Sequence, residues 1–285
     1  MPGLSSRVLG CMLTIVFSCP PPGPTDKMRE TQEVPFQLVG GFLIEFEGTI
    51  GGLEGLRFIL DTGATHSVVD RRIARKLGVP LRPAEVFDFD TNRVIAGEGV
   101  FPEVRFGPVI LKDVDLFAAN LGALSTFAEN ADAVVGMDLL GFGSFAIDYD
   151  QRRMFFQPVE RSLSSVRLHD SAMCLQLRVQ DHVMELLLDT GIEGLVLFED
   201  RLRREIPNLV TEGKQKYIRL GPHTRAIQTT IPGIYLGTKE INQNVWLIKG
   251  PKSGALPGLY GYLGASALKP HRLEFDISGT HLRFQ

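Results

Sequence analysis

Cysteine is scarce in this 285-residue chain, and its scarcity excludes a scaffold held together by disulfides. Only three cysteines occur, and two of them, Cys11 and Cys19, lie in an N-terminal segment ahead of the folded body. The third, Cys174, stands in a strand-like run and has no partner for an internal disulfide. A buried, unreactive thiol is the ordinary interpretation of such a residue.

The motifs of metal-dependent and serine hydrolases are also missing. Six histidines are scattered without the His-Glu-x-x-His spacing that binds catalytic zinc. No Gly-x-Ser-x-Gly elbow occurs. Residues 88–92 imitate the start of a calcium loop, but Arg93 and Gly99 stand where that loop needs Gly and Glu. We therefore expect neither a metal nor another cofactor.

The charge pattern gives no sign of a nucleic-acid partner. The net charge is −3, and the chain has no long basic cluster. Arg71, Arg72, Arg75 and Lys76 follow a helical spacing, which is typical of a solvated helix face.

Long hydrophobic runs are absent except for one short run near the N-terminus. Residues 8–17 are apolar and follow Arg7, as in a signal peptide. They are too few to cross a bilayer of about 30 Å as a helix. Residues 16–19 (Val-Phe-Ser-Cys) resemble a bacterial lipobox, so Cys19 is a candidate for lipidation. We expect residues 1–34 to be a leader and Pro-rich tether. The body would then be periplasmic or membrane-tethered, with the lipid as its only membrane contact.

A short acidic motif, by contrast, is present twice. Residues 58–63 and 186–191 each read as a buried strand that ends in Asp-Thr-Gly, and their aspartates lie 128 residues apart. Gly136 and Gly264 repeat at the same offset, each after two hydrophobic residues. The length of the chain suits two domains of about 125 residues. We therefore predict two copies of one half, residues 35–160 and 161–285, with a linker near residues 157–165.

Two copies of a carboxylate predict a specific chemistry. Homologous halves pack most simply about a pseudo-two-fold axis, which brings equivalent points face to face. Like charges about 3 Å apart cannot both ionise, so the pair would hold one proton and offer an acid and a base together. Such a pair can drive the attack of water on an amide without a metal or a covalent intermediate.

The order of motifs resembles the retropepsin and pepsin class of aspartic proteases over residues 35–285. The resemblance implies an all-β, bilobal acid-protease fold with two retropepsin-like β-barrel lobes and short helices. It also implies that Asp61 and Asp189 form the catalytic dyad of an aspartic endopeptidase. The residues that it places around the dyad are Thr62, Gly63, Ala64, Thr190, Gly191, Ile192, Gly136 and Gly264.

The resemblance further implies a flap hairpin over a peptide or protein substrate held in an extended conformation. Residues 94–100, with Gly97 and Gly99, are the best flap candidate, and residues 217–223 occupy the comparable interval of the second half. No tyrosine precedes Tyr149, whereas pepsin-like flaps carry one, so a fused retropepsin is the better comparison. A fused chain would act as a monomer, because it contains both halves of the site.

The residue after the second motif leaves an alternative open. The first half has Ala64 at this position, where the family carries a small or hydroxylated residue, but the second half has Ile192. The alternative is a peptide-binding or structural module that kept the fold and lost catalysis.

The local patterns predict strands over residues 37–46 and 56–60, separated by a Gly-rich turn region. Residues 68–77 have helical spacing and stop at Gly78, with Pro80 beyond. Residues 197–205 predict the equivalent helix, with Pro207 after it.

Overall fold

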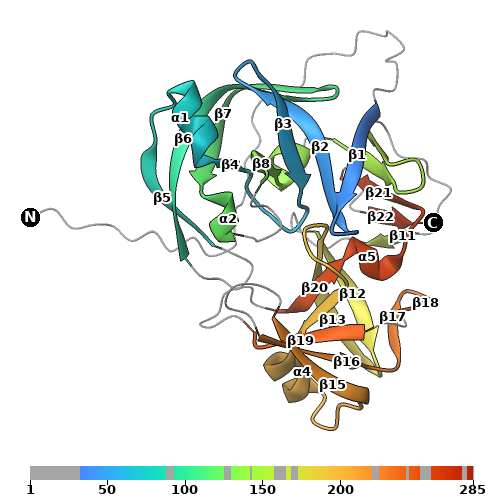
Figure 1. Ribbon diagram of the computed structural model, residues 1–285. Coiled ribbons are helices and arrows are strands. Elements are labelled where there is room, and N and C mark those ends of the chain that lie inside the picture. The colour runs from blue at the N-terminus through green and yellow to red at the C-terminus, as the bar shows by residue number, and fades with distance from the viewer. Residues whose placement is uncertain are drawn as a thin grey trace, which may run out of the picture.

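The computed structural model describes residues 33–87, 93–124, 130–141, 143–156, 165–167, 173–219, 225–241, 244–250, 258–277 and 281–284. Residues 1–32 of the expected leader and tether, most of the linker and the calcium-like residues 88–92 lie outside these ranges. The last two residues of that expected segment, 33 and 34, belong to the first strand of the fold and pair with residues 154 and 155. Within them, strands predominate and the helices are short, and the chain forms two lobes (Figure 1). The prediction of an all-β, bilobal fold is therefore confirmed. None of the helices in the described ranges has the length and apolar character needed to cross a membrane.

The first lobe is a curved sheet with the strand order β3-β8-β4-β7-β6-β5. The long β6–β7 hairpin curls back, and β6 pairs with β2. The elements of this lobe are β1 (Glu33–Val39), β2 (Leu43–Ile50), β3 (Leu53–Leu60), β4 (Val68–Asp70), α1 (Arg71–Leu77), β5 (Arg82–Phe87), β6 (Arg93–Phe106), β7 (Val109–Ala119), α2 (Leu121–Leu124), β8 (Ala133–Val135), α3 (Met137–Leu140), β9 (Phe145–Asp148) and β10 (Arg153–Phe156).

The second lobe has the order β13-β20-β14-β19-β16-β15, which matches the first lobe strand for strand. In both lobes the strand that leads to Asp-Thr-Gly pairs in parallel with the strand that leads to the glycine at the repeated offset. These pairs are β3 with β8, before Gly136, and β13 with β20, which ends at Gly264. The elements are β11 (Ser165–Arg167), β12 (Cys174–Val179), β13 (His182–Asp189), β14 (Leu195–Phe198), α4 (Glu199–Glu205), β15 (Glu212–Arg219), β16 (Arg225–Thr230), β17 (Ile234–Leu236), β18 (Lys239–Glu240), β19 (Asn244–Ile248), β20 (Leu259–Gly264), α5 (Ala265–Leu268), β21 (Arg272–Asp276) and β22 (His281–Phe284).

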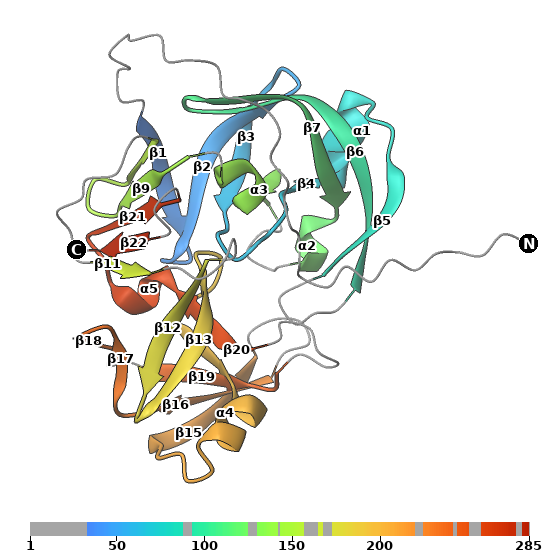
Figure 2. The same cartoon turned by 180° about the vertical axis from the view of Figure 1, so that it is seen from behind.

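A six-stranded sheet joins the lobes, with the order β11-β22-β21-β9-β10-β1 (Figure 2). Three of its strands come from each half, and β9 and β21 pair at its centre. There Phe145 and Phe275 are fully buried and stack with their ring centroids 4.4 Å apart. Burial of two such rings stabilises the junction and sets the lobes in a defined orientation.

Both helices after the Asp-Thr-Gly motifs begin later than the sequence pattern suggests. Residues 68–70 form β4, which is buried between β7 and β8, and α1 begins at Arg71. Likewise Leu197 and Phe198 belong to β14, and α4 begins at Glu199. Sheet pairing therefore overrides helical spacing at these positions. The C-terminal cap of α1 agrees with the prediction, since Gly78 adopts φ 67°.

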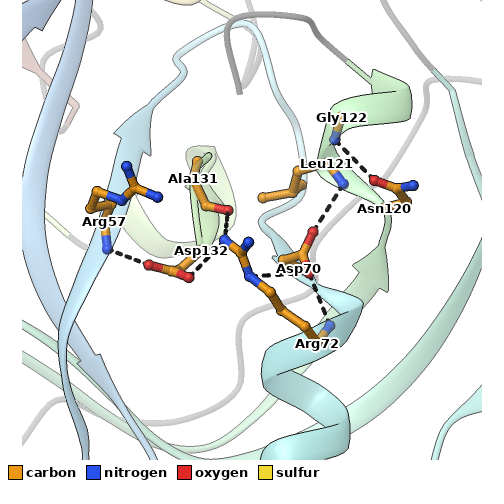
Figure 3. Close-up of polar contacts among 8 residues, drawn as sticks. All are labelled: Arg57, Asp70, Arg72, Asn120, Leu121, Gly122, Ala131 and Asp132. Carbon is orange, nitrogen blue, oxygen red and sulfur yellow. Dashed lines mark hydrogen bonds and ion pairs between the residues drawn. The ribbon is translucent and has the colours of Figure 1, made fainter. Parts of the chain in front are cut away.

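A polar network ties α1 to the segment that precedes β8 (Figure 3). The Asp70 side chain caps α1 by accepting from the N–H of Arg72, and it also accepts from the N–H of Leu121. The Arg72 guanidinium donates to Asp132, at 2.9 Å, and Asp132 accepts from the N–H of Arg57 on β3. These bonds hold the entry to β8 against β3, close to the first Asp-Thr-Gly motif.

Candidate active site

The two motif aspartates meet at the junction of the lobes. Asp61 directly follows β3, and Asp189 ends β13. The Asp61 N–H donates to the carbonyl of Val135 on β8, and Asp189 pairs with Gly264 on β20. A Cβ built on Gly191 would lie 2.9 Å from Cγ of Asp61 and 3.0 Å from Oδ1 of Asp189, so the two carboxyl groups adjoin each other. Asp189 is buried, whereas Asp61 keeps partial contact with solvent. The structure thus brings the two motif aspartates together.

Two glycines make this close approach possible. A Cβ built on Gly63 would lie 2.6 Å from Oδ2 of Asp189, and a Cβ built on Gly191 would lie 2.9 Å from Oδ2 of Asp61. Real Cβ atoms do not approach other atoms so closely. Each motif glycine therefore leaves room for the carboxylate of the opposite motif.

Thr62 and Thr190 cross the junction and hold the two loops together. Each hydroxyl accepts from the backbone N–H of the other threonine, at 3.0 and 3.1 Å. The Thr62 hydroxyl also donates to the carbonyl of Leu188, at 2.9 Å, and the Thr190 hydroxyl donates to the carbonyl of Leu60, at 3.1 Å. Both side chains are 1 % exposed. The four bonds fix the relative position of the two carboxylates.

We expect Thr190→Val to destabilise the protein while it preserves the shape of the side chain. The N–H of Thr62 and the carbonyl of Leu60 would each lose a partner in a buried place, at about 1–3 kcal/mol per orphaned group. Urea denaturation measures the loss of unfolding free energy. The control is Thr65→Val, an exposed threonine of the first Asp-Thr-Gly loop. Equal stability of the two variants would contradict a role for the crossed bonds.

The two carboxyl groups differ in their backbone donors. Asp61 Oδ1 accepts from the N–H groups of Gly63 and Ala64, at 2.9 and 3.0 Å. Asp189 Oδ1 accepts from the N–H of Gly191, at 2.7 Å, whereas the N–H of Ile192 donates to the Asp189 carbonyl instead. The first loop therefore stabilises a negative charge better than the second.

The pKa of each carboxyl follows from this difference. Burial raises the pKa of Asp61, while the hydrogen bond from Asp189 and the N–H donors of Gly63 and Ala64 oppose the rise. Burial, followed by the charge of Asp61 and the hydrogen bond to it, raises the pKa of Asp189 well above its ordinary value of 3.8. Together with the two backbone donors of Asp61 against the one of Asp189, these directions favour a proton on Asp189 and a charge on Asp61.

The glycines at the repeated offset lie directly behind the two loops. A Cβ on Gly136 would stand 2.7 Å from the carbonyl oxygen of Ala64, and one on Gly264 would collide with the carbonyl oxygen of Ile192. Ala64 and the Ile192 side chain are partly buried, and Ile192 packs against the core. All eight residues that the family resemblance places around the dyad therefore lie in the two loops or directly behind them.

The flap candidates Gly97 and Gly99 lie inside a strand and not at the tip of a hairpin. Both belong to β6, where they are buried and pair with β7, and Gly97 also pairs with Pro83 of β5. A Cβ on Gly97 would press on Leu81 at 2.8 Å. The connection between β5 and β6, at residues 88–92, lies outside the described residues, as does the lipidation candidate Cys19.

Sequence reasoning missed a set of supporting side chains behind the loops. The Ser67 hydroxyl donates to Asp138 at 2.6 Å and accepts from the N–H of Gly136 at 2.8 Å. In the second lobe the Ser266 hydroxyl accepts from the N–H of Gly194 at 2.8 Å. Asp138 and Ser266 both stand two residues after an offset glycine, so the repeat itself could have pointed to them.

Metal chemistry has no candidate site in the described part of the chain. No group of three or more His, Cys, Asp or Glu residues there is placed to hold a metal ion. The described residues instead bring together two adjacent carboxyl groups, one buried on Asp189 and one partly exposed on Asp61.

Comparison with known families agrees with this geometry for the first lobe. Residues 46–139 match the family model described as aspartyl protease. The matched segment begins in β2 and ends in α3, so it contains Asp61 and Gly136. No curated protein matches the chain. Residues 46–139 are thus similar to an aspartyl protease domain, which supports a peptidase, and the match does not extend to the second Asp-Thr-Gly motif.

Proposed function

We propose that the protein is a fused, two-lobe retropepsin-like aspartic endopeptidase whose dyad is Asp61 and Asp189. One observation carries the proposal. The two motif carboxyl groups, 128 residues apart in the chain, lie together at the lobe junction, where a Cβ on the glycine of either motif would collide with the carboxyl of the other. A carboxyl pair that merely ended two strands would not need two glycines to admit it or two buried threonines to hold it.

The difference between the two loops assigns the roles in hydrolysis. Asp61, which accepts two backbone N–H bonds, is the charged base that takes a proton from the attacking water. Asp189 holds the shared proton and donates it to the carbonyl oxygen of the scissile amide. Asp61 then gives its proton to the leaving nitrogen, and the C–N bond breaks. As the new carboxyl group forms, one hydroxyl of the tetrahedral intermediate returns a proton to Asp189, so the dyad regains its starting state.

The substrate in this proposal is an extended peptide that lies between the lobes. Such a chain binds as an added strand, and its alternate side chains enter pockets on either side. Both carboxylates come from one chain, so the monomer contains a complete site.

Digestion of a peptide library at several pH values tests the proposal. We expect cleavage by the natural protein and none by Asp61→Asn, which lacks the base but keeps a side chain of the same shape. Products from both samples would indicate a contaminating protease. Absence of cleavage with retained peptide binding would favour the alternative, an inactive peptide-binding module, for which Ile192 is the supporting feature.

We expect Ile192→Thr to move the alkaline limb of the pH–rate profile to lower pH. A hydroxyl beside Asp189 stabilises the ionised carboxylate, whereas the isoleucine offers no donor, so the substitution lowers the pKa at which the dyad loses its last proton. Activity needs that proton, so it would be lost at a lower pH. The measurement is kcat/KM against pH with one peptide. Ile192→Val is the control, and an unchanged or raised limb in Ile192→Thr would show that residue 192 does not tune the dyad.

For localisation, we propose export followed by lipid attachment at Cys19. The apolar residues 8–17 and the lipobox-like residues 16–19 support this proposal. Mass spectrometry of the mature N-terminus is expected to show loss of residues 1–18 and a lipid-sized mass increase on Cys19. Recovery of Met1, or of unmodified Cys19, would contradict it.

A further inference from the structure

A row of side chains in the second lobe shares the sheet face of Asp189. The strand register aligns Leu187 with Tyr262, Tyr262 with Val196, and Val196 with Trp246. Paired residues on neighbouring strands point to the same face, and so do residues two apart along one strand. Because Asp189 is two residues beyond Leu187, Trp246 lies on the face of the sheet that carries Asp189.

The first lobe has the equivalent row. Its register aligns Ile59 with Val134, Val134 with Val68, and Val68 with Phe117. Ile59 is two residues before Asp61, so this row shares the face of the other catalytic carboxylate. Phe117 therefore occupies the place in its lobe that Trp246 occupies in the second.

The two aromatic residues differ in what covers them. His66 packs edge-on against Phe117, with ring centroids 5.4 Å apart. The residue 128 positions after His66 is Gly194, and a Cβ there would stand 3.4 Å from Nε1 of Trp246. Gly194 has φ +69°, a conformation that disfavours a side chain. Trp246 is consequently only partly buried, and its indole N–H has no hydrogen bond to any described residue.

The residue that precedes the covering position in the sequence also differs in charge between the lobes. Glu193 precedes Gly194, is exposed, and has no ion pair with any described residue. Its counterpart in the first lobe is the uncharged Thr65, whose hydroxyl lies 3.0 Å from Nδ1 of His66. The second lobe therefore has an indole that no side chain covers and a free carboxylate one residue before Gly194. The equivalent place in the first lobe has a covered phenyl ring and an uncharged threonine.

We propose that Glu193, Gly194 and Trp246 form an outer subsite that binds a lysine or arginine side chain of the substrate. The alkyl stem of such a residue would pack on the indole, and its charge would face the ring and the Glu193 carboxylate. Three strand spacings of about 4.8 Å separate β13 from β19, and an extended chain advances about 3.4 Å per residue. A peptide that crosses these strands at right angles, paired along a hairpin above them, would therefore place the basic residue about four positions from the scissile bond. This inference rests on the proposed peptidase function.

The subsite would give the substrate a direction. A pseudo-two-fold dyad alone accepts an extended chain in either orientation. The proposed subsite at one end is acidic and aromatic, whereas the equivalent place at the other end has Thr65 and His66. The two orientations of a bound peptide would therefore differ in binding free energy. A peptide with one basic residue would then be cut at one bond.

Trp246 is the sole tryptophan of the chain, so its fluorescence reports directly on the proposed subsite. The probes are decapeptides with the sequence preferred in the library digestion, each with lysine or uncharged norleucine at one position. They are titrated into Asp61→Asn, which keeps Trp246 and does not consume the peptide. We expect a saturable change in emission. We also expect about two- to fivefold tighter binding of lysine than of norleucine at one position, about four residues from the scissile bond.

Glu193→Gln in the same background is expected to abolish the preference for lysine, and Thr65→Val, the matched change in the first lobe, to leave it intact. A labelled decapeptide, followed by anisotropy, measures binding independently of Trp246. If it binds and the natural protein cleaves it, but the preference survives Glu193→Gln or the Trp246 emission does not respond, the subsite is overturned and the peptidase stands. If the natural protein neither cleaves nor binds library peptides, the proposed function itself fails.

Discussion

Asp189→Asn is expected to lower turnover by about 10²–10⁴-fold and to leave the fold intact. Asparagine has the shape of the protonated carboxyl and can still donate a hydrogen bond to Asp61. It cannot transfer a proton to the scissile carbonyl, however, because its amide is not acidic at any relevant pH. The loss should appear in kcat, since the groove that binds the peptide is unchanged.

The control for this variant is Asp113→Asn, the same change at an exposed carboxylate of β7. Asp113 has φ 51°, a conformation that asparagine tolerates. It should retain full turnover. Circular dichroism and urea denaturation establish that both variants are folded. A folded Asp189→Asn protein with near-natural turnover would contradict the dyad.

Gly63→Ala is expected to reduce activity by at least about 10²-fold through geometry alone. Its methyl group would occupy the space of the Asp189 carboxylate, so the two carboxyl groups would have to separate, and a displacement of about 1 Å is enough for a loss of this size. The overpacking should also cost about 1–3 kcal/mol of unfolding free energy. Activity and urea denaturation measure the two effects.

Gly143→Ala is the matched control, because a Cβ at Gly143 meets nothing within 4 Å. It should behave as the natural protein in both assays. If Gly63→Ala also left activity and unfolding free energy unchanged, the close approach of the two carboxylates would not depend on this glycine.

The repeat made the arrangement of the dyad predictable. Two Asp-Thr-Gly motifs and two glycines at one offset are local patterns, and a pseudo-two-fold axis follows from them without coordinates. The structure agrees with that expectation at Gly63, Gly191, Gly136 and Gly264. Backbone that packs too closely for a Cβ requires glycine, and a required glycine can be recognised in the sequence.

The helix limits were less predictable. Residues 68–70 have helical spacing, but β7 and β8 lie on either side of them and turn them into a strand. The position of Gly97 and Gly99 also escaped prediction, because nothing local distinguishes a glycine inside β6 from one at a hairpin tip. Pairing partners that are 14 or more residues away along the chain decide such cases.

The sequence by itself determined the all-β, two-lobed fold, the two aspartates and the glycines that admit them. All of these depend on motifs that repeat along the chain. Only the tertiary structure decided which carboxyl holds the proton, because that depends on how many backbone N–H groups each loop turns inward. It also decided that Trp246 lies against Gly194. Gly194 and Trp246 are 52 positions apart, and no periodic pattern in a single sequence indicates such a contact. The register of β14 against β19 brings the two residues together.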